Sequence, residues 1–299
     1  MMTTETLKRH ERIRLICQLA SAALFNGFVK GFAKGRIFTG KTKMLCVPVL
    51  NCYSCPGALG SCPIGALQTV LGGADHSFPF YALGTIMLFG VILGRLICGF
   101  LCPFGLVQDL LNRIPAKTII IPAHIDRPLR YLKYGILVIL VLLLPLLLTD
   151  GYGISQPYFC KLICPAGTME GGISHLLLNR DLQKLAGALF GWKLFLLLMV
   201  LVGAVFIPRC FCRYICPLGA FYSLFNRFSL YRMELDKTKC VGCKECERVC
   251  PMEVKVTRDT NDGECIRCGR CRAACPSGAI SCGLLPLSNK TKELKPKNE

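Results

Sequence analysis

Charged residues are scarce in this sequence. Only 18% of the 299 residues are Asp, Glu, Lys or Arg, whereas 53% are hydrophobic. An ordinary soluble domain is about 45–50% apolar, and the charged residues here lie mostly outside a few long apolar runs. The shortage of charge therefore argues against a soluble chain and predicts membrane spans.

Signatures of catalysis and export are missing as well. The sequence has no nucleotide-binding loop and no nucleophile–base pair, so we expect a non-catalytic subunit of an oxidoreductase system. It contains no C-x-x-C-H segment, and His76 and His175 are interpreted as ordinary interfacial histidines, in preference to haem or quinol ligands. No A-x-A-like site follows the polar start, Met1–Arg14, so no cleavable signal peptide is expected.

Acidic residues are outnumbered by basic ones, 18 against 36, which gives a formal net charge of +18. Most Lys and Arg residues flank apolar runs, where they face lipid headgroups. We therefore expect membrane lipid as a partner, and no nucleic acid. The last residues, 286–299, are rich in lysine and are predicted to form a basic disordered tail.

Four stretches are long and apolar enough to span a bilayer, which takes about 20 residues of helix. The first is the weakest, because polar residues such as Gln18 and Ser21 interrupt it. The predicted spans are Ile13–Phe32, Phe78–Ile97, Leu129–Thr149 and Leu185–Ile207.

The membrane part repeats itself. Cys98-Gly-Phe-Leu-Cys102-Pro and Cys212-Arg-Tyr-Ile-Cys216-Pro match at an offset of 114 residues. Cys62-Pro-Ile-Gly65 and Cys164-Pro-Ala-Gly167 are a looser echo. The repeat predicts two similar two-helix halves, about 1–118 and 119–232, related by a pseudo-two-fold axis along the membrane normal.

Two cysteine runs near the carboxyl end have the spacing C-x2-C-x2-C-x3-C-P, which is typical of two-cluster ferredoxins. The pattern predicts a small α+β domain over 233–285 that carries two [4Fe–4S] clusters. The last cysteine of each run serves the other cluster, and zinc is the less favoured alternative. The predicted ligands are Cys240, Cys243, Cys246 and Cys275 for one cluster, and Cys250, Cys265, Cys268 and Cys271 for the other.

Two further metal sites are candidates in the membrane part, with structural thiols or reversible disulfides as the alternative. The pseudo-two-fold axis brings together an inner group: Cys98, Cys102, Cys212 and Cys216. An outer group lies at the opposite face: Cys52, Cys55, Cys62, Cys160 and Cys164. Cys17 and Cys210 are interpreted as packing residues, and Cys46 and Cys282 have no motif.

Ferredoxin cysteines must stay reduced until iron and sulfide arrive, so the C-terminal domain is expected in the cytosol. Four spans then place both termini inside a multi-pass protein of the cell (inner) membrane. The whole is predicted to be mainly α, a four-helix transmembrane domain followed by the ferredoxin-like domain.

The inner C-x3-C-P motifs and the double ferredoxin motif resemble those of the NapH-type membrane ferredoxins, which are related to the C-terminal membrane part of NosR. The resemblance implies electron passage between the quinone pool and a reductase or its maturation system. The outer cysteines, among them Cys52, Cys55 and Cys62, depart from the family's pattern.

The function predicted from the sequence is therefore iron–sulfur electron transfer between a quinone or cytosolic donor and a partner redox enzyme. A thiol–disulfide relay across the membrane, and a redox-sensing or assembly factor, are the alternatives.

Overall fold

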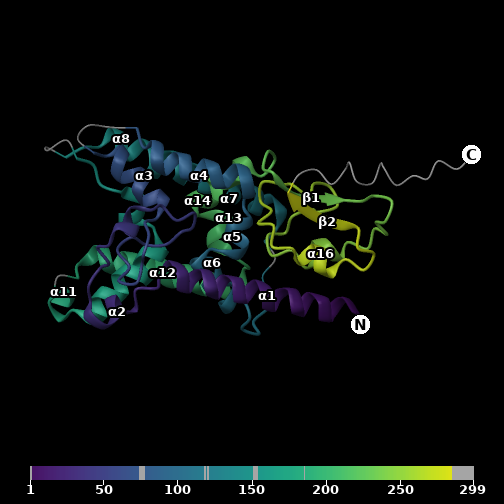
Figure 1. The fold of residues 1–299 in the computed structure, drawn as a ribbon, viewed down its shortest axis with the longest axis horizontal. Helices are drawn as coiled ribbons and strands as arrows, with labels where there is room; N and C mark the ends of the chain where they lie inside the picture. Colours follow the sequence, from purple (N-terminus) through teal and green to yellow (C-terminus); the bar gives the residue numbers. More distant parts are fainter. Residues whose placement is uncertain are drawn as a thin grey trace, which may run out of the picture.

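The apolar helices extend along the long axis of the molecule, and the cysteine-rich C-terminal segment lies at one end of it (Figure 1). The structure is a computed structural model that describes residues 2–73, 78–117, 119, 121–150, 154–184 and 186–284. His76 and the predicted tail, 286–299, lie outside the described residues.

The first helix, α1 (Met2–Phe25), starts earlier than predicted and reaches the C-terminal segment. The sequence predicted one span over Ile13–Phe32, but the chain leaves the helix after Phe25 and forms a separate short helix, α2 (Val29–Lys34). A 3-10 turn, η1 (Lys41–Met44), and helix α3 (Pro63–Leu71) follow.

Polar side chains explain why α1 is not a simple span. Gln18 is buried and donates hydrogen bonds to the carbonyl of Gly99 (3.2 Å) and to the carboxylate of Asp109 (3.0 Å). The hydroxyl of Ser21 donates to the carbonyl of Leu101 (2.5 Å). The positions that weakened the predicted span are thus the ones that attach the helix to the rest of the protein.

The second predicted span, Phe78–Ile97, is broken in the structure. Helix α4 covers Phe80–Leu93, and α5 covers Leu96–Phe100. The break falls at Gly94, whose φ of +56° suits glycine and interrupts a helix. Helix α6 (Pro103–Leu111) then begins at a proline, which suits the first position of a helix.

Two helices are long and apolar enough to cross a membrane within the described residues. The first runs continuously over Ala123–Leu147 and consists of α7 (Ala123–Ile136), a π-helical segment, η2 (Leu137–Leu143), and α8 (Leu144–Leu147). The second is α12 (Ala188–Phe206). The prediction of four continuous spanning helices is therefore met by only two of them.

Short helices connect these two and lead to the second inner motif. Between them lie α9 (Tyr158–Leu162), the π-helical η3 (Gly167–Ile173), α10 (Ser174–Leu178) and α11 (Arg180–Lys184). After α12 come α13 (Cys210–Tyr214) and α14 (Pro217–Phe225).

The C-terminal segment is a small α+β unit, as predicted. Strands β1 (Tyr231–Leu235) and β2 (Ile280–Leu284) pair antiparallel, with Tyr231 opposite Leu284. Two short helices follow the cysteine loops: α15 (Glu245–Arg248) and α16 (Arg270–Ala274).

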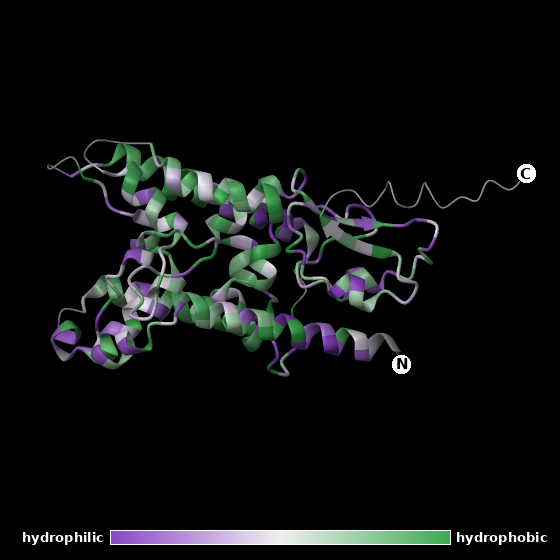
Figure 2. Ribbon diagram, in the orientation of Figure 1, coloured by the Kyte–Doolittle hydropathy of each residue, from purple (hydrophilic) through white to green (hydrophobic). Residues whose placement is uncertain are grey.

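The two long helices carry their apolar side chains outward. In Figure 2 hydrophobic residues dominate the helices between the two ends of the molecule. Only 28% of the most apolar stretch of Ala123–Leu147 and 17% of that of α12 are buried inside the protein. A core helix of a soluble protein is mostly buried, so these surfaces suit contact with lipid.

The ferredoxin-type segment is docked on the membrane part through α1 and α5. The ring Nε2–H of His10 donates to the carbonyl of Cys268 (2.7 Å), and Arg270 pairs with Glu11 (2.9 Å). On the other side, a Cβ atom on Gly99 of α5 would lie 2.5 Å from the carbonyl oxygen of Ile266. The backbones of the two parts therefore meet directly.

Replacing Gly99 with alanine tests this docking. The added methyl group meets a backbone oxygen that cannot rotate away, so we expect Gly99→Ala to cost about 1–3 kcal/mol and to lower the melting temperature in detergent by roughly 3–10 °C. Gly84→Ala in α4 is the control, because nothing lies within 4 Å of its Cβ position. Equal melting temperatures for the two variants would contradict the docked arrangement.

Candidate iron–sulfur sites

The two ferredoxin-type cysteine runs fold into matching loops. The residues on either side of the second cysteine have positive φ in both runs: Gly242 (+71°) and Lys244 (+55°) in the first, Arg267 (+51°) and Gly269 (+76°) in the second. Left-handed residues in a tight turn direct backbone N–H groups inward and form a concavity suited to an anion. An anionic iron–sulfur cluster needs such donors around its sulfur atoms.

Arg267 has a strained, left-handed backbone, and the contacts of its side chain account for that conformation. It corresponds to Gly242 of the first run, where no strain arises. Its guanidinium donates to the carbonyls of Leu93 (3.1 Å) and Asn226 (2.6 Å) in the membrane part. The left-handed conformation therefore costs about 1–2 kcal/mol in exchange for two hydrogen bonds that dock the loop.

Cys250 lies beside the second run, although it belongs to the first. Burial and the neighbouring Cys268 thiol raise the pKa of Cys250 to about 11. Burial and the thiols of Cys268, Cys265 and Cys250 raise the pKa of Cys271. These four cysteines thus form one spatial group, which has the same members as one of the two predicted ligand sets.

The other group contains Cys275 of the second run. Burial, the Glu247 carboxylate, and the thiols of Cys275 and Cys243 raise the pKa of Cys246. The crossing of the last cysteines follows from the turn at Pro251 and Pro276, which directs each away from its own loop.

The inner group lines one small cavity in the structure. Two of its four cysteines lie within α5 and α13, and the other two precede α6 and α14. All four are buried: Cys98, Cys102, Cys212 and Cys216. The cavity volume is about 10 Å³, which is the space that one water molecule needs. A four-iron cluster is larger, so these side chains must move outward before one fits.

Two arginines hold the halves of the inner group together, because each binds the half opposite to its own. Arg95 of the first half donates to the carbonyl of Cys212 in the second (3.2 Å), and Arg209 of the second half donates to the carbonyl of Cys98 in the first (2.5 Å). Each arginine lies three residues before the motif cysteine of its own half. Such reciprocal contacts are what a two-fold relation between halves produces.

Both arginines are fully buried and paired with carboxylates. Arg95 pairs with Glu264 (3.0 Å), which also binds Lys133 (2.5 Å), and Arg209 pairs with Asp109 (2.5 Å). The Arg209 and Arg14 guanidinium groups hold the pKa of Asp109 well below its usual range, although burial opposes them. The buried charges beside the inner group are therefore paired with charges of the opposite sign.

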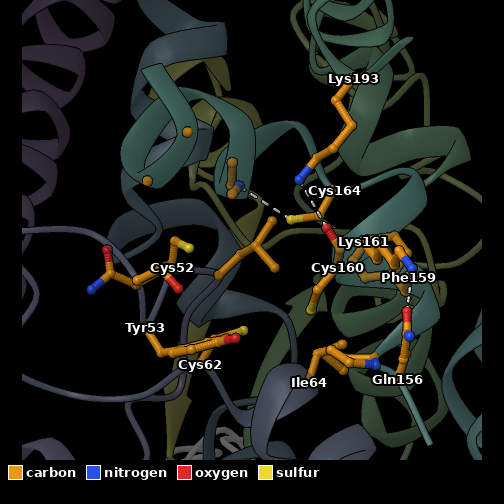
Figure 3. Close-up of a pocket in the computed structure, with 18 of the residues that line it drawn as sticks. Cys52, Tyr53, Cys62, Ile64, Gln156, Phe159, Cys160, Lys161, Cys164 and Lys193 are labelled. Carbon is orange, nitrogen blue, oxygen red and sulfur yellow. Dashed lines mark hydrogen bonds between the residues drawn. The ribbon is translucent and has the colours of Figure 1, made fainter. Parts of the chain in front are cut away.

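The outer group is brought together only in part. A cavity of about 490 Å³ is lined by four of its five members, which we call the outer quartet: Cys52, Cys62, Cys160 and Cys164. Figure 3 shows these four side chains around the hollow. Cys55, the fifth member, is buried but does not line this cavity.

Glycines make room for the outer quartet. A Cβ atom on Gly167 would lie 3.7 Å from the sulfur atoms of both Cys164 and Cys52, and one on Gly65 would lie 3.9 Å from that of Cys160. The Cys-Pro-x-Gly echo in the sequence thus places glycines beside three of the four thiols, Cys52, Cys160 and Cys164.

A single metal ion does not fit any of these arrangements. Among the described residues, no three His, Cys, Asp or Glu side chains converge on a point that one ion occupies. In the part of the chain that the structure describes, this holds for the ferredoxin-type cysteines as well as for the membrane cysteines. Thiols around a four-iron cluster are held apart because each binds a different iron, whereas zinc requires four ligands about one point.

A glutamine on α6 binds across the inner group, and sequence reasoning missed it. Gln108 accepts a hydrogen bond from the backbone N–H of Phe211 (3.1 Å) and donates one to the sulfur of Cys212 (3.2 Å). It is buried six residues after Cys102. The sequence feature that could have identified Gln108 is its place in the segment Cys-Pro-x-Gly-x-x-Gln, which occurs twice.

The same bridge recurs in the outer quartet. Gln68, six residues after Cys62, accepts from the backbone N–H of Phe159 (3.0 Å) and donates to the sulfur of Cys160 (3.4 Å). The two cysteine groups are thus built from one repeated arrangement of residues.

The remaining candidates have ordinary partners. His175 lines the outer cavity, but its Nε2–H donates to the carbonyl of Ser54 (2.8 Å). The Cys210 thiol donates to the carbonyl of Val200 (3.4 Å), and Cys282 accepts from Arg272 (3.0 Å). Cys17, interpreted from the sequence as a packing residue, is exposed on α1 and so does not pack inside the protein.

Family models match both parts of the chain. One described as "4Fe-4S binding domain" matches residues 75–122, 134–184 and 189–234, and one described as "4Fe-4S dicluster domain" matches residues 232–276. No solved structure matches the chain.

Three relatives show how far the similarity extends. An uncharacterized protein of Methanocaldococcus jannaschii is 34% identical over 61% of this chain and 69% of its own length. The methylamine utilization ferredoxin-type protein MauN of Paracoccus denitrificans is 29% identical over 80% of this chain and 75% of its own. The ferredoxin-type protein NapH of Haemophilus influenzae is 31% identical over 60% of this chain and 55% of its own.

Taken with the cysteine loops, these matches define an iron–sulfur electron-transfer protein that binds [4Fe–4S] clusters. The chain belongs to the NapH-type ferredoxin family, which confirms the resemblance that its motifs predicted.

A substitution of Arg209 tests whether these buried arginines hold the inner group together. Arg209→Lys keeps the charge but loses the fork that binds Asp109 and the Cys98 carbonyl together, so we expect a loss of about 1–3 kcal/mol in the free energy of unfolding. Thermal unfolding in detergent measures it. Arg113→Lys, at an exposed position, is the matched control. A loss of similar size there would contradict a stabilising role for the buried ion pairs.

Proposed function

We propose that the protein is a membrane-bound carrier of single electrons between a quinone or cytosolic donor and a partner redox enzyme. One observation supports this above the others. The second ferredoxin-type run lies directly against the inner group, because Gly99, next to Cys98, approaches the Ile266 carbonyl and lies within 3.6 Å of the Cys268 backbone when a Cβ is added. Cluster ligands and membrane cysteines are therefore neighbours.

The proposed ligands in the ferredoxin-type segment are the two crossed sets. Each iron of a cluster takes one thiolate, and a bound [4Fe–4S] cluster accepts and releases one electron at a time. The chain's own residues supply the thiolates and the inward backbone N–H groups, and the packing of α1 on α16 covers the second loop. Cys240, Cys243, Cys246 and Cys275 hold one cluster, and Cys250, Cys265, Cys268 and Cys271 hold the other.

The proposed setting is the cell membrane, with the ferredoxin-type segment and both termini on the cytosolic side. Exposed apolar side chains support it, since large exposed apolar surfaces are costly in water. Helices α1 and α4 would complete the four crossings beside the two long helices. The outward-facing apolar residues include Leu88, Val91, Val138, Leu142, Leu198 and Val202.

A thiol–disulfide relay is the second candidate function. The closed inner cavity favours it, because four buried free thiols surround too little space for a cluster without movement. The two functions differ in a measurable way. A relay holds iron only in the ferredoxin-type segment and forms disulfides in the inner group on oxidation, whereas a metal site there protects the thiols from alkylation.

The ligand assignment is tested with Cys250→Ser in the full-length, anaerobically reconstituted protein. We expect the substitution to remove up to about four irons from the cluster held by the second run, with loss of its electron paramagnetic resonance signal after reduction by dithionite. The other ferredoxin-type signal should remain. Cys282→Ser is the control, because Cys282 lies in β2 outside both sets.

Electron transfer itself is tested by mixing the reduced wild-type protein with a soluble quinone and following the loss of the reduced-cluster signal. Rapid reoxidation supports the proposal. Clusters that neither accept nor release electrons on mixing, or zinc in place of iron and sulfide, would overturn it.

A further inference from the structure

The outer quartet and the inner group are two copies of one structural design. In each, a Cys-Pro-x-Gly-x-x-Gln helix faces a Phe-Cys-x3-Cys-Pro segment, and the glutamine joins them. The last cysteine of that segment accepts a hydrogen bond from the glycine N–H three residues later, at 3.3 Å for Gly167 and Cys164 and at 3.3 Å for Gly219 and Cys216. The last thiol of that segment is therefore held by the same backbone donor in both groups.

The two copies differ in the space between their thiols. The outer cavity measures about 490 Å³, against about 10 Å³ for the inner one. The larger cavity leaves far more room between the thiols for a four-iron core. The four outer thiols lie on different elements around it, as cluster ligands must.

A buried amide in the wall of the outer cavity also lacks a partner. Asn51 is 0% exposed, and neither its Oδ1 nor its Nδ2 has a hydrogen-bond partner among the described residues. An unpaired buried polar group costs about 1–3 kcal/mol, so its presence indicates a polar or anionic occupant nearby.

We infer that the outer quartet, Cys52, Cys62, Cys160 and Cys164, binds a further [4Fe–4S] cluster at the end of the membrane part remote from the ferredoxin-type segment. Cys55 is outside the ligand set. Binding at this site does not depend on the proposed electron-carrier function, but it deepens that function, because it gives electrons an outlet on the far side of the membrane part.

A short segment of chain connects the inner and outer sites. Leu50 lines both cavities, so at this point a single residue separates them. The segment is held on the inner side by buried Tyr222, whose hydroxyl donates to the carbonyl of Pro48 (2.9 Å). On the outer side the N–H of Cys52 donates to Glu170 (2.7 Å). The two sites are thus close neighbours that this segment separates.

The experiment compares Cys160→Ser with Cys55→Ser in the full-length protein, purified and reconstituted with iron and sulfide without oxygen. We expect wild type and Cys55→Ser to hold about four irons and four sulfides beyond those of the two ferredoxin-type clusters, and Cys160→Ser to lose them. Cys62→Ser should show the same loss. Retained ferredoxin-type paramagnetic signals show that each variant is folded.

Full iron and sulfide in Cys160→Ser and Cys62→Ser would overturn the inference, as would an equal loss in Cys55→Ser or a wild type with only the ferredoxin-type iron. None of these results bears on reoxidation by quinone, so the inference and the proposed function fail separately.

Discussion

Sulfur atoms buried at the amino ends of helices are the constraint on which the membrane part depends. A thiolate away from water needs hydrogen-bond donors, and the first turn of a helix offers unpaired N–H groups and a favourable dipole. Cys62, Cys102 and Cys216 occupy the residue before a helix, with proline next, where its missing N–H is not needed. The glycine two residues after that proline lets other groups approach closely. The four Cys-Pro-x-Gly segments therefore fix both where helices start and where thiols gather.

The buried ion pairs of Arg95 and Arg209 impose a second constraint. Arg95 and Arg209 each satisfy a carbonyl of the opposite half, and the carboxylates that neutralise them come from the ferredoxin-type segment and from α6. A buried charge that loses its partner is strongly destabilising. The two halves and the C-terminal segment are thus tied to one another by residues that cannot be exposed or separated singly.

The sequence was sufficient for those features that short motifs determine. The doubled cysteine runs predicted the α+β unit, and the repeat predicted that Cys98, Cys102, Cys212 and Cys216 would meet. The sequence was insufficient where contacts between distant residues determine the structure. The buried role of Gln18 and Ser21 in α1, and the break at Gly94, depend on neighbours 80 or more residues away. Spacing alone also does not reveal on which side of a loop a thiol lies, so the sequence could not show that Cys55 does not line the outer cavity. Gln68 and Gln108 went unnoticed because one glutamine in a helix is unremarkable until its repeat is seen.

The length of α1 has a consequence for how the protein is made. Thr6 donates to the carbonyl of Ala273, 267 residues later, so α1 binds a segment that is made long after it. Contacts of such separation form late, because the intervening chain must be complete. Helix α1 therefore lacks its partner on α16 until the chain has been made through Ala273, so the second cysteine loop is covered by α1 only after its own cysteines have been synthesised.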